Sequence, residues 1–123
     1  MSEEQTILIA EDDHFLSNIY QTKLKKEGFQ VLIAKDGEEA LSLIQEKKPS
    51  VVLLDIMMSK LDGFGVLEEM QKDKDLKKIP VIIMSNLGQD SDVQKGKELG
   101  AKDYIIKSDT TLVSVVETIR KYL

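Results

Sequence analysis

Short apolar runs alternate five times with longer segments of helical character, and this alternation most constrains the fold. We expect strands over residues 6–10, 29–34, 51–54, 81–84 and 104–106. Apolar periodicity indicates helices over residues 13–27, around 40–44 and 64–70, and over 110–122, and a polar helix is expected over about 89–99. Five strand–helix units in a row predict a parallel sheet with helices on both faces. Right-handed crossovers favour a flavodoxin-like, doubly wound (βα)5 fold of the α/β class, with strand order 2-1-3-4-5.

The composition excludes several classes of protein. The chain has 123 residues, enough for one compact domain, and we expect a single domain over residues 1–123. It has no cysteine, which rules out disulfides and thiolate metal sites and is compatible with a cytoplasmic location. The acidic N-terminus does not resemble a signal peptide, and no apolar run approaches the roughly 20 residues of a membrane span. A net charge of −5 should repel phosphate backbones, so we expect no direct nucleic-acid binding by this segment.

Asp55 directly follows the most apolar run of the chain, residues 51–54. Such a run is typical of a strand buried on both faces, and a carboxylate at its end costs free energy unless a cation, a partner or a reaction offsets it. In an open α/β sheet the carboxyl ends of the strands meet at one edge, where ligands bind. The other expected strands at this edge also end in polar residues, namely Glu11, Asp12 and Asp13, then Ser85 and Asn86, then Lys107 and Ser108.

This set of residue types suits phosphoryl chemistry. Three or more carboxylates within a few ångströms cannot all ionise cheaply, and a hard divalent cation would offset their repulsion. Mg²⁺ fits best, because it binds one or two carboxylates, keeps waters and shares a phosphate with its substrate, and Mn²⁺ is expected to substitute for it. Lys107 would then counter the charge of an anionic group, and Ser85 would supply a hydroxyl donor. Asp55 can act as a nucleophile, since aspartyl phosphate is a known type of covalent intermediate.

Some of these residues also have a purely structural interpretation. Acids are favoured at the start of a helix, and Asp13 is expected only to cap the first helix, which leaves Asp12 first and Glu11 second as metal ligands. His14, the only histidine, is expected at the surface. Met57 and Met58 resemble a soft metal pair, but without cysteine or a histidine cluster they are expected to fill core and loop space.

The motifs together resemble those of the receiver domain of two-component response regulators, with the fold of the chemotaxis regulator, over essentially the whole chain. The matching residues are Glu11-Asp12 after the first strand, Asp55 leading to Asp62-Gly63, Ser85, and residues 100–104 leading to Lys107. Each motif alone would be a weak signal. All of them in order and at the family's spacing form a specific one.

The resemblance implies a role for each matching residue. Asp55 would accept a phosphoryl group from a histidine kinase. Asp12 would bind Mg²⁺ directly, Glu11 would bind it through water, and the backbone carbonyl of Met57 would complete the protein ligands. Ser85 would hydrogen-bond the phosphoryl group and Lys107 would pair with it. Tyr104 would change rotamer as Ser85 moves, or is simply a packed strand residue. Phosphorylation would bias a surface built from the fourth helix, fifth strand and fifth helix.

Three positions depart from the family pattern. Ser59 stands where the family usually has proline. Lys107-Ser108 stands where it usually has lysine and proline joined by a cis bond. A cis bond before a residue other than proline costs about 2.5–4 kcal/mol, so this bond is expected to be trans, or cis and strained. Asn86 is larger than the usual residue at its position, and we expect it to slow access to the phosphate.

The function that follows is that of a receiver domain rather than a metabolic enzyme, with phosphotransfer and dephosphorylation catalysed by the domain itself. The implied partners are a histidine kinase, a phosphotransfer protein or a small phosphodonor, and a downstream protein or effector domain. A phosphorylation-dependent homodimer stays open. A receiver-like scaffold that is never phosphorylated is one alternative, and the intact acids and Lys107 argue against it. An aspartyl-phosphate hydrolase like the haloacid dehalogenases would carry a second acid where this chain has Met57.

Overall fold

Strands and helices alternate along the whole chain in the computed structural model, which describes residues 5–123. The strands are β1 (Thr6–Ala10), β2 (Gln30–Ala34), β3 (Val51–Leu54), β4 (Val81–Ser85) and β5 (Asp103–Ile106). The helices are α1 (His14–Lys26), α2 (Gly37–Lys47), α3 (Gly63–Gln71), α4 (Asp90–Glu98) and α5 (Leu112–Lys121), with the short 3-10 helices η1 (Leu76–Lys78) and η2 (Lys107–Asp109). All neighbouring strands pair in parallel in the order β2-β1-β3-β4-β5, which confirms the predicted fold class and topology.

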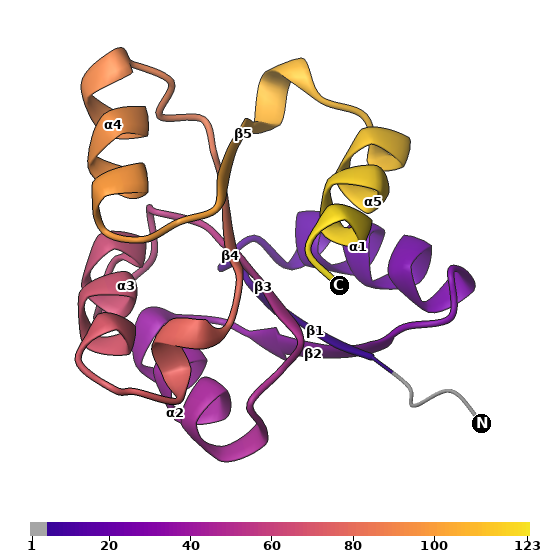
Figure 1. The fold of residues 1–123 in the computed structure, drawn as a ribbon. Helices are drawn as coiled ribbons and strands as arrows, with labels where there is room; N and C mark the ends of the chain where they lie inside the picture. The colour runs from indigo at the N-terminus through magenta and orange to yellow at the C-terminus, as the bar shows by residue number, and fades with distance from the viewer. Residues whose placement is uncertain (1–4) are drawn as a thin grey trace.

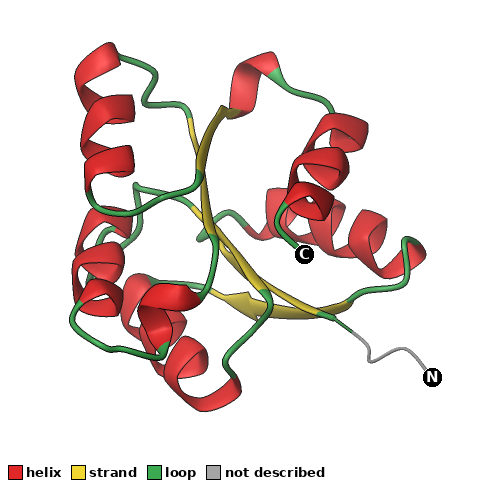
Figure 2. Ribbon diagram, viewed as in Figure 1, coloured by secondary structure: helices red, strands yellow, loops and turns green. Residues whose placement is uncertain are grey.

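The sheet lies between two layers of helices (Figure 1, Figure 2). Helices α1 and α5 cover one face, and α2, α3 and α4 cover the other. Successive side chains of a strand point to opposite faces, so β1 contributes Ile7 and Ile9 to the core under α1 and α5, and Leu8 and Ala10 to the other core. All four residues of β3 are buried, as expected for a central parallel strand.

Polar side chains at the ends of the loops start most of the helices. Asp13 accepts hydrogen bonds from the backbone N–H groups of Phe15 (2.9 Å) and Leu16 (3.2 Å), and so caps α1. The carboxylates of Asp36 and Asp62 cap α2 and α3 in the same way, and the hydroxyl of Thr111 caps α5. Because each cap stands just after the carboxyl end of a strand, the capping residues and the candidate site share one edge of the sheet.

The segment after β5 differs from the prediction. A helix was expected from residue 110, whereas residues 107–109 form η2 and α5 begins only at Leu112. The hydroxyl of Thr111 caps α5 and so sets its start two residues later than apolar periodicity suggested. The residues before the cap include the 3-10 turn η2. No peptide bond among residues 5–123 is cis, so Lys107–Ser108 is trans, the first of the two alternatives.

Two expectations bear on processing and membranes. The N-terminal stretch that argued against a signal peptide falls mostly on residues 1–4, which lie outside the described residues. From residue 5 onward, no helix is both long and apolar enough to span a bilayer.

Candidate functional site

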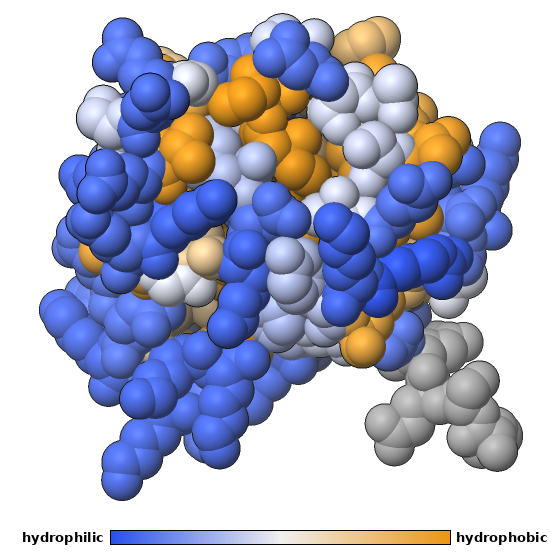
Figure 3. All heavy atoms as spheres, turned by 45° about the horizontal axis from the view of Figure 1, so that its top comes forward, coloured by the Kyte–Doolittle hydropathy of each residue, from blue (hydrophilic) through white to orange (hydrophobic). Residues whose placement is uncertain are grey.

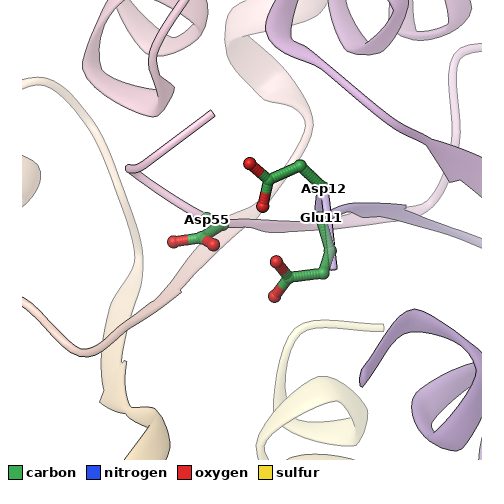
Figure 4. Close-up of side chains that lie close together, drawn as sticks. All are labelled: Glu11, Asp12 and Asp55. Atoms are coloured by element: carbon green, nitrogen blue, oxygen red, sulfur yellow. The ribbon is translucent and has the colours of Figure 1, made fainter. Parts of the chain in front are cut away.

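Three carboxylates converge at the carboxyl edge of the sheet (Figure 4). One oxygen from each of Glu11, Asp12 and Asp55 lies within 4.8 Å of the other two. Glu11 and Asp55 are buried, with only 4% and 6% of their surface exposed, and Asp12 is exposed. The backbone holds the two buried acids in place, because the N–H of Glu11 donates to Ala34 O and that of Asp55 donates to Ala10 O, each at 3.0 Å. These hydrogen bonds between strands therefore hold Glu11 and Asp55 next to each other.

Lys107 reaches this cluster from the end of β5. Its ammonium donates a hydrogen bond to Oε1 of Glu11 and another to Oδ2 of Asp55, the latter at 2.9 Å. The Lys107 side chain is only 11% exposed. Three carboxylates and one ammonium leave two negative charges uncompensated when all four groups are ionised, which is the charge that one divalent cation neutralises.

Burial and charge shift the pKa values of this cluster. Burial raises the pKa of Glu11 to about 7, repulsion from Asp55 adds to the rise, and the hydrogen bond from Lys107 opposes it. For Lys107, burial lowers the pKa, but the hydrogen bonds to Glu11 and Asp55 outweigh burial and the net pKa is raised. Lys107 thus stays charged, whereas the raised pKa of Glu11 brings the ionisation of this acid close to neutral pH.

The cluster fits Mg²⁺. This ion takes octahedral oxygen ligands at about 2.0–2.1 Å, so oxygens on opposite sides of it stand about 4.2 Å apart. The three carboxylate oxygens lie within 4.8 Å of one another, slightly wider than that span, and they are the hard ligands that Mg²⁺ prefers. Asp13, the least favoured of the predicted metal ligands, stays outside the cluster, where it caps α1 and its N–H donates to Oε2 of Glu11 at 3.2 Å.

The loop after β3 holds Asp55 through its backbone. The N–H of Met57 lies 3.3 Å from Oδ1 of Asp55, so the two carboxylate oxygens have different partners. A Cβ atom at Gly63 would lie 2.3 Å from the carbonyl oxygen of Asp55, so the loop can close only with glycine there. The Met57 side chain lies in this loop and is 64% exposed, whereas Met58 packs in the core, so the two methionines take the loop and core places expected of the pair.

The same loop packs against the start of α2. The N–H of Gly37 donates to the carbonyl oxygen of Ser59 at 3.3 Å, and a Cβ atom at Gly37 would lie 1.7 Å from the carbonyl oxygen of Leu61. Ser59 therefore contributes a hydrogen-bond acceptor to this contact through its backbone carbonyl. A proline in its place would supply the same carbonyl. Nothing in the sequence marks Leu61 as the contact that requires Gly37, because the approach is between two backbones.

At the end of β4, Ser85 is buried and Asn86 is exposed. The hydroxyl oxygen of Ser85 accepts a hydrogen bond from the N–H of Leu87 at 3.1 Å. Tyr104 of β5 donates a hydrogen bond from its hydroxyl to the carbonyl oxygen of the same Leu87. Burial raises the pKa of Tyr104, which keeps this hydroxyl protonated as a donor. The backbone of Leu87 thus joins both predicted switch residues, Ser85 through its N–H and Tyr104 through its carbonyl oxygen, and a backbone link of this kind has no sequence signal.

Comparison with known proteins shows which family this chain belongs to. Residues 7–117 match the family described as response regulator receiver domain. The chain belongs to this family. A receiver domain is a signalling module rather than an enzyme in the ordinary sense, and an acidic cluster such as Glu11, Asp12 and Asp55 is typical of the metal site of a receiver domain.

Individual relatives agree with the family. The receiver domain is 45% identical over 104 residues to the probable transcriptional regulator ycf27 of Guillardia theta, covering 85% of this chain and 40% of that protein. The chain thus spans about two-fifths of the length of the curated relatives it matches.

Solved structures show the same fold. The chemotaxis protein CheY4 of Vibrio cholerae matches with a TM-score of 0.91 at 22% identity, over 98% of this chain and 100% of that one, which establishes a chemotaxis-regulator-like fold. The response regulator Rcp1, solved in a Mn²⁺-bound form, matches with a TM-score of 0.80 at 30% identity, over 95% of this chain and 90% of that one.

Proposed function

We propose that this receiver domain accepts a phosphoryl group on Asp55 in a Mg²⁺-dependent reaction. The donor is a histidine kinase, a phosphotransfer protein or a small phosphodonor such as acetyl phosphate. The observation that carries the proposal is the contact of Lys107 with Asp55 inside a cluster of three carboxylates, because it supplies a nucleophile and a fixed counter-charge at one point.

In the proposed reaction a carboxylate oxygen of Asp55 attacks the phosphorus atom of the donor. A new oxygen–phosphorus bond forms as the bond from phosphorus to the donor's nitrogen or oxygen breaks, and the donor atom leaves with the electron pair. Lys107 then pairs with the phosphoryl oxygens, and the Ser85 hydroxyl donates a hydrogen bond to one of them. Water later hydrolyses the acyl phosphate, which the domain itself promotes, and the exposed Asn86 beside Ser85 is expected to slow this step.

Asp12 and Asp55 would hold Mg²⁺ directly, Glu11 would hold it through water, and the backbone carbonyl of Met57 would complete the protein ligands. The bound ion would supply positive charge where negative charge collects on the transferred phosphoryl group. Mn²⁺ is expected to substitute, and a relative solved with Mn²⁺ supports this. The domain's own contribution is to hold the two buried acids in position, since hydrogen bonds from neighbouring strands fix their backbones.

Exposed apolar residues support a protein partner. Phe15, Met57 and Val113 are 74%, 64% and 57% exposed, and they belong to segments that follow β1, β3 and β5 at the acidic edge. Apolar patches stand among charged side chains on the face of the molecule turned forward in Figure 3. A groove of about 470 Å³ beside α1, lined mainly by apolar atoms of Phe15, Ile19 and Leu112, would add to such a contact.

The output of phosphorylation is a change in the surface formed by α4, β5 and α5, with Tyr104 as the residue that reports the state of Ser85. This surface would bind a downstream protein or effector domain, or a second phosphorylated copy of the chain. The relatives named as probable transcriptional regulators suggest that the effector acts on transcription, in which case this domain regulates it without touching nucleic acid. We place the unit, over residues 1–123, in the cytoplasm with its kinase.

Intact-mass measurement tests the proposal. The protein is incubated with acetyl phosphate and Mg²⁺, with matched samples that contain EDTA or carry Asp55→Asn. We expect a phosphoryl adduct that requires Mg²⁺ and is absent from the variant. No adduct in the unaltered protein, or an unchanged adduct in Asp55→Asn, would favour the non-phosphorylated scaffold instead.

A further inference from the structure

Gly96 is the buried position of α4, and it lies against Tyr104 and Ile83. A Cβ atom on Gly96 would stand 3.2 Å from Cδ2 of Tyr104 and 2.6 Å from Cδ1 of Ile83. Helix α4 runs beside the edge strand β5 that carries Tyr104 (Figure 1). Glycine inside a helix costs about 0.5–1 kcal/mol relative to alanine, so its position here suggests a compensating contact. That contact is the close approach of the helix backbone to the tyrosine ring.

The ring beneath Gly96 is connected to the acidic site through the backbone of one residue, Leu87. The Tyr104 hydroxyl donates to the carbonyl oxygen of Leu87, and the N–H of Leu87 donates to the hydroxyl oxygen of Ser85 at 3.1 Å. Because the Ser85 oxygen already accepts this bond, the Ser85 proton is left to donate elsewhere. Ser85 ends β4, next to the strand that Asp55 follows, so a phosphoryl group on Asp55 would be an acceptor for that proton.

We propose that Gly96 is a positioning residue for phosphoryl acceptance, because it makes room for the Tyr104 ring, whose hydroxyl holds the backbone of Leu87 and thereby helps to orient Ser85 as a donor. The inference rests on the function proposed above and adds to it a residue in α4 that belongs to neither the metal cluster nor the phosphoryl contacts.

Alanine at position 96 separates this role from general stability. The methyl group raises helix propensity, so α4 should stay folded. The group also presses on the ring of Tyr104, 3.2 Å away, so the ring must shift by a few tenths of an ångström and its hydrogen bond to Leu87 should weaken. Ser85 then loses its fixed orientation, and phosphorylation of Asp55 should slow although no group in the acidic cluster has changed.

Four variants make the test specific. They are Gly96→Ala, Tyr104→Phe, the double variant of both, and the control Ser91→Ala, which adds no contact at an exposed position of the same helix. Because Ile83 is also close to position 96, a further variant combines Gly96→Ala with Ile83→Val. That change removes the Cδ1 atom, which is the nearest contact of the added methyl group, and keeps the contact with the ring, so it protects the fold if the single variant is unstable.

Two readouts are needed. The first is the position of the Tyr104 ring in the unphosphorylated variants, from a crystal structure or from ring chemical shifts with labelled tyrosine. The second is the rate of phosphorylation by acetyl phosphate, followed by intact mass. We expect the ring to shift away from Leu87 and its hydrogen bond to lengthen in Gly96→Ala, with and without Ile83→Val. The rate should fall on the order of fivefold or more, and Ser91→Ala should keep the original rate. Adding Gly96→Ala to Tyr104→Phe should change the rate by less than about twofold, since both act through one bond.

The outcomes distinguish this inference from the proposed function. A ring that stays on Leu87 in Gly96→Ala overturns the inference whether or not the protein is phosphorylated. Effects of Gly96→Ala and Tyr104→Phe that multiply also overturn it, because the helix would then act by another route. Absence of any adduct on the unaltered protein overturns the proposed function, and the ring position still decides whether Gly96 places Tyr104.

Discussion

The ammonium of Lys107 lies 2.9 Å from Oδ2 of Asp55, although the two residues are 52 positions apart in the chain. Lys107 follows β5 and Asp55 follows β3, with β4 between them in the sheet. The contact therefore crosses the end of β4, the strand that ends in the buried Ser85. The site is a property of three neighbouring strand ends rather than of any one segment.

Replacing Lys107 with methionine should destabilise the protein more at high pH than at low pH. The variant leaves Glu11 and Asp55 together without their shared cation, which costs about 3–5 kcal/mol when both are ionised. The cost should shrink as the pH falls, because Glu11 takes up a proton, and loss of the hydrogen bond from Lys107 raises the pKa of Glu11 further. Urea unfolding at about pH 5.5 and pH 8 measures the difference. Lys102→Met, at an exposed position, is the control and should show little change at either pH.

The ionisation of Glu11 should respond to Asp55. Burial is the main cause of the raised pKa of Glu11, and repulsion from Asp55 adds to it. Asp55→Asn removes that negative charge, so the pKa of Glu11 should fall from about 7 toward the ordinary value of a glutamate. Carboxyl-carbon NMR of labelled protein follows the titration directly. A pKa that stays where it was would show that Asp55 does not influence Glu11 electrostatically.

Without metal, stability should fall as the pH rises through neutrality. The folded protein keeps the Glu11 proton up to about pH 7, whereas an ordinary glutamate loses it near 4.5. The contribution is therefore fully present below pH 4.5 and is lost as the pH rises through 7. Urea unfolding in EDTA should show this slope, and Glu11→Gln should remove it. Mg²⁺ binds the ionised cluster, so adding it should raise stability most at high pH. Equal stabilisation by Mg²⁺ at low and high pH would count against binding at this cluster.

Gly37→Ala should destabilise the domain by about 2–4 kcal/mol, because a Cβ atom there would overlap the carbonyl oxygen of Leu61. The nearest groups on both sides of this contact belong to the backbone, so no side-chain rotation can relieve the overlap. The loop that carries Met57 should shift with it, and Mg²⁺ affinity should fall. Thermal unfolding and a Mg²⁺ titration measure the two effects. Ser42→Ala, at an exposed position of the same helix, should leave both unchanged.

Much of the fold could be predicted because its signals are local. The apolar run at residues 51–54 marks a buried strand wherever it occurs, and Gly28 and Gly100 end α1 and α4 with φ of +96° and +107°, as their places after the helices indicated. The late start of α5 was missed because the capping bond of Thr111 overrides apolar periodicity. The trans bond at Lys107–Ser108 stayed undecided, because both isomers fit the same residues.

The favoured strand order, the edge where the site lies and the residue types gathered there could be predicted from the sequence, because hydrophobic periodicity is a local signal and right-handed crossovers leave few topologies. Which groups contact one another could be seen only in the folded structure. It joined Lys107 to both Glu11 and Asp55, it left Asp13 as a cap, and it placed Gly96 over Tyr104. These contacts depend on the distance between elements far apart in the chain, which packing fixes to within an ångström and which no local pattern encodes.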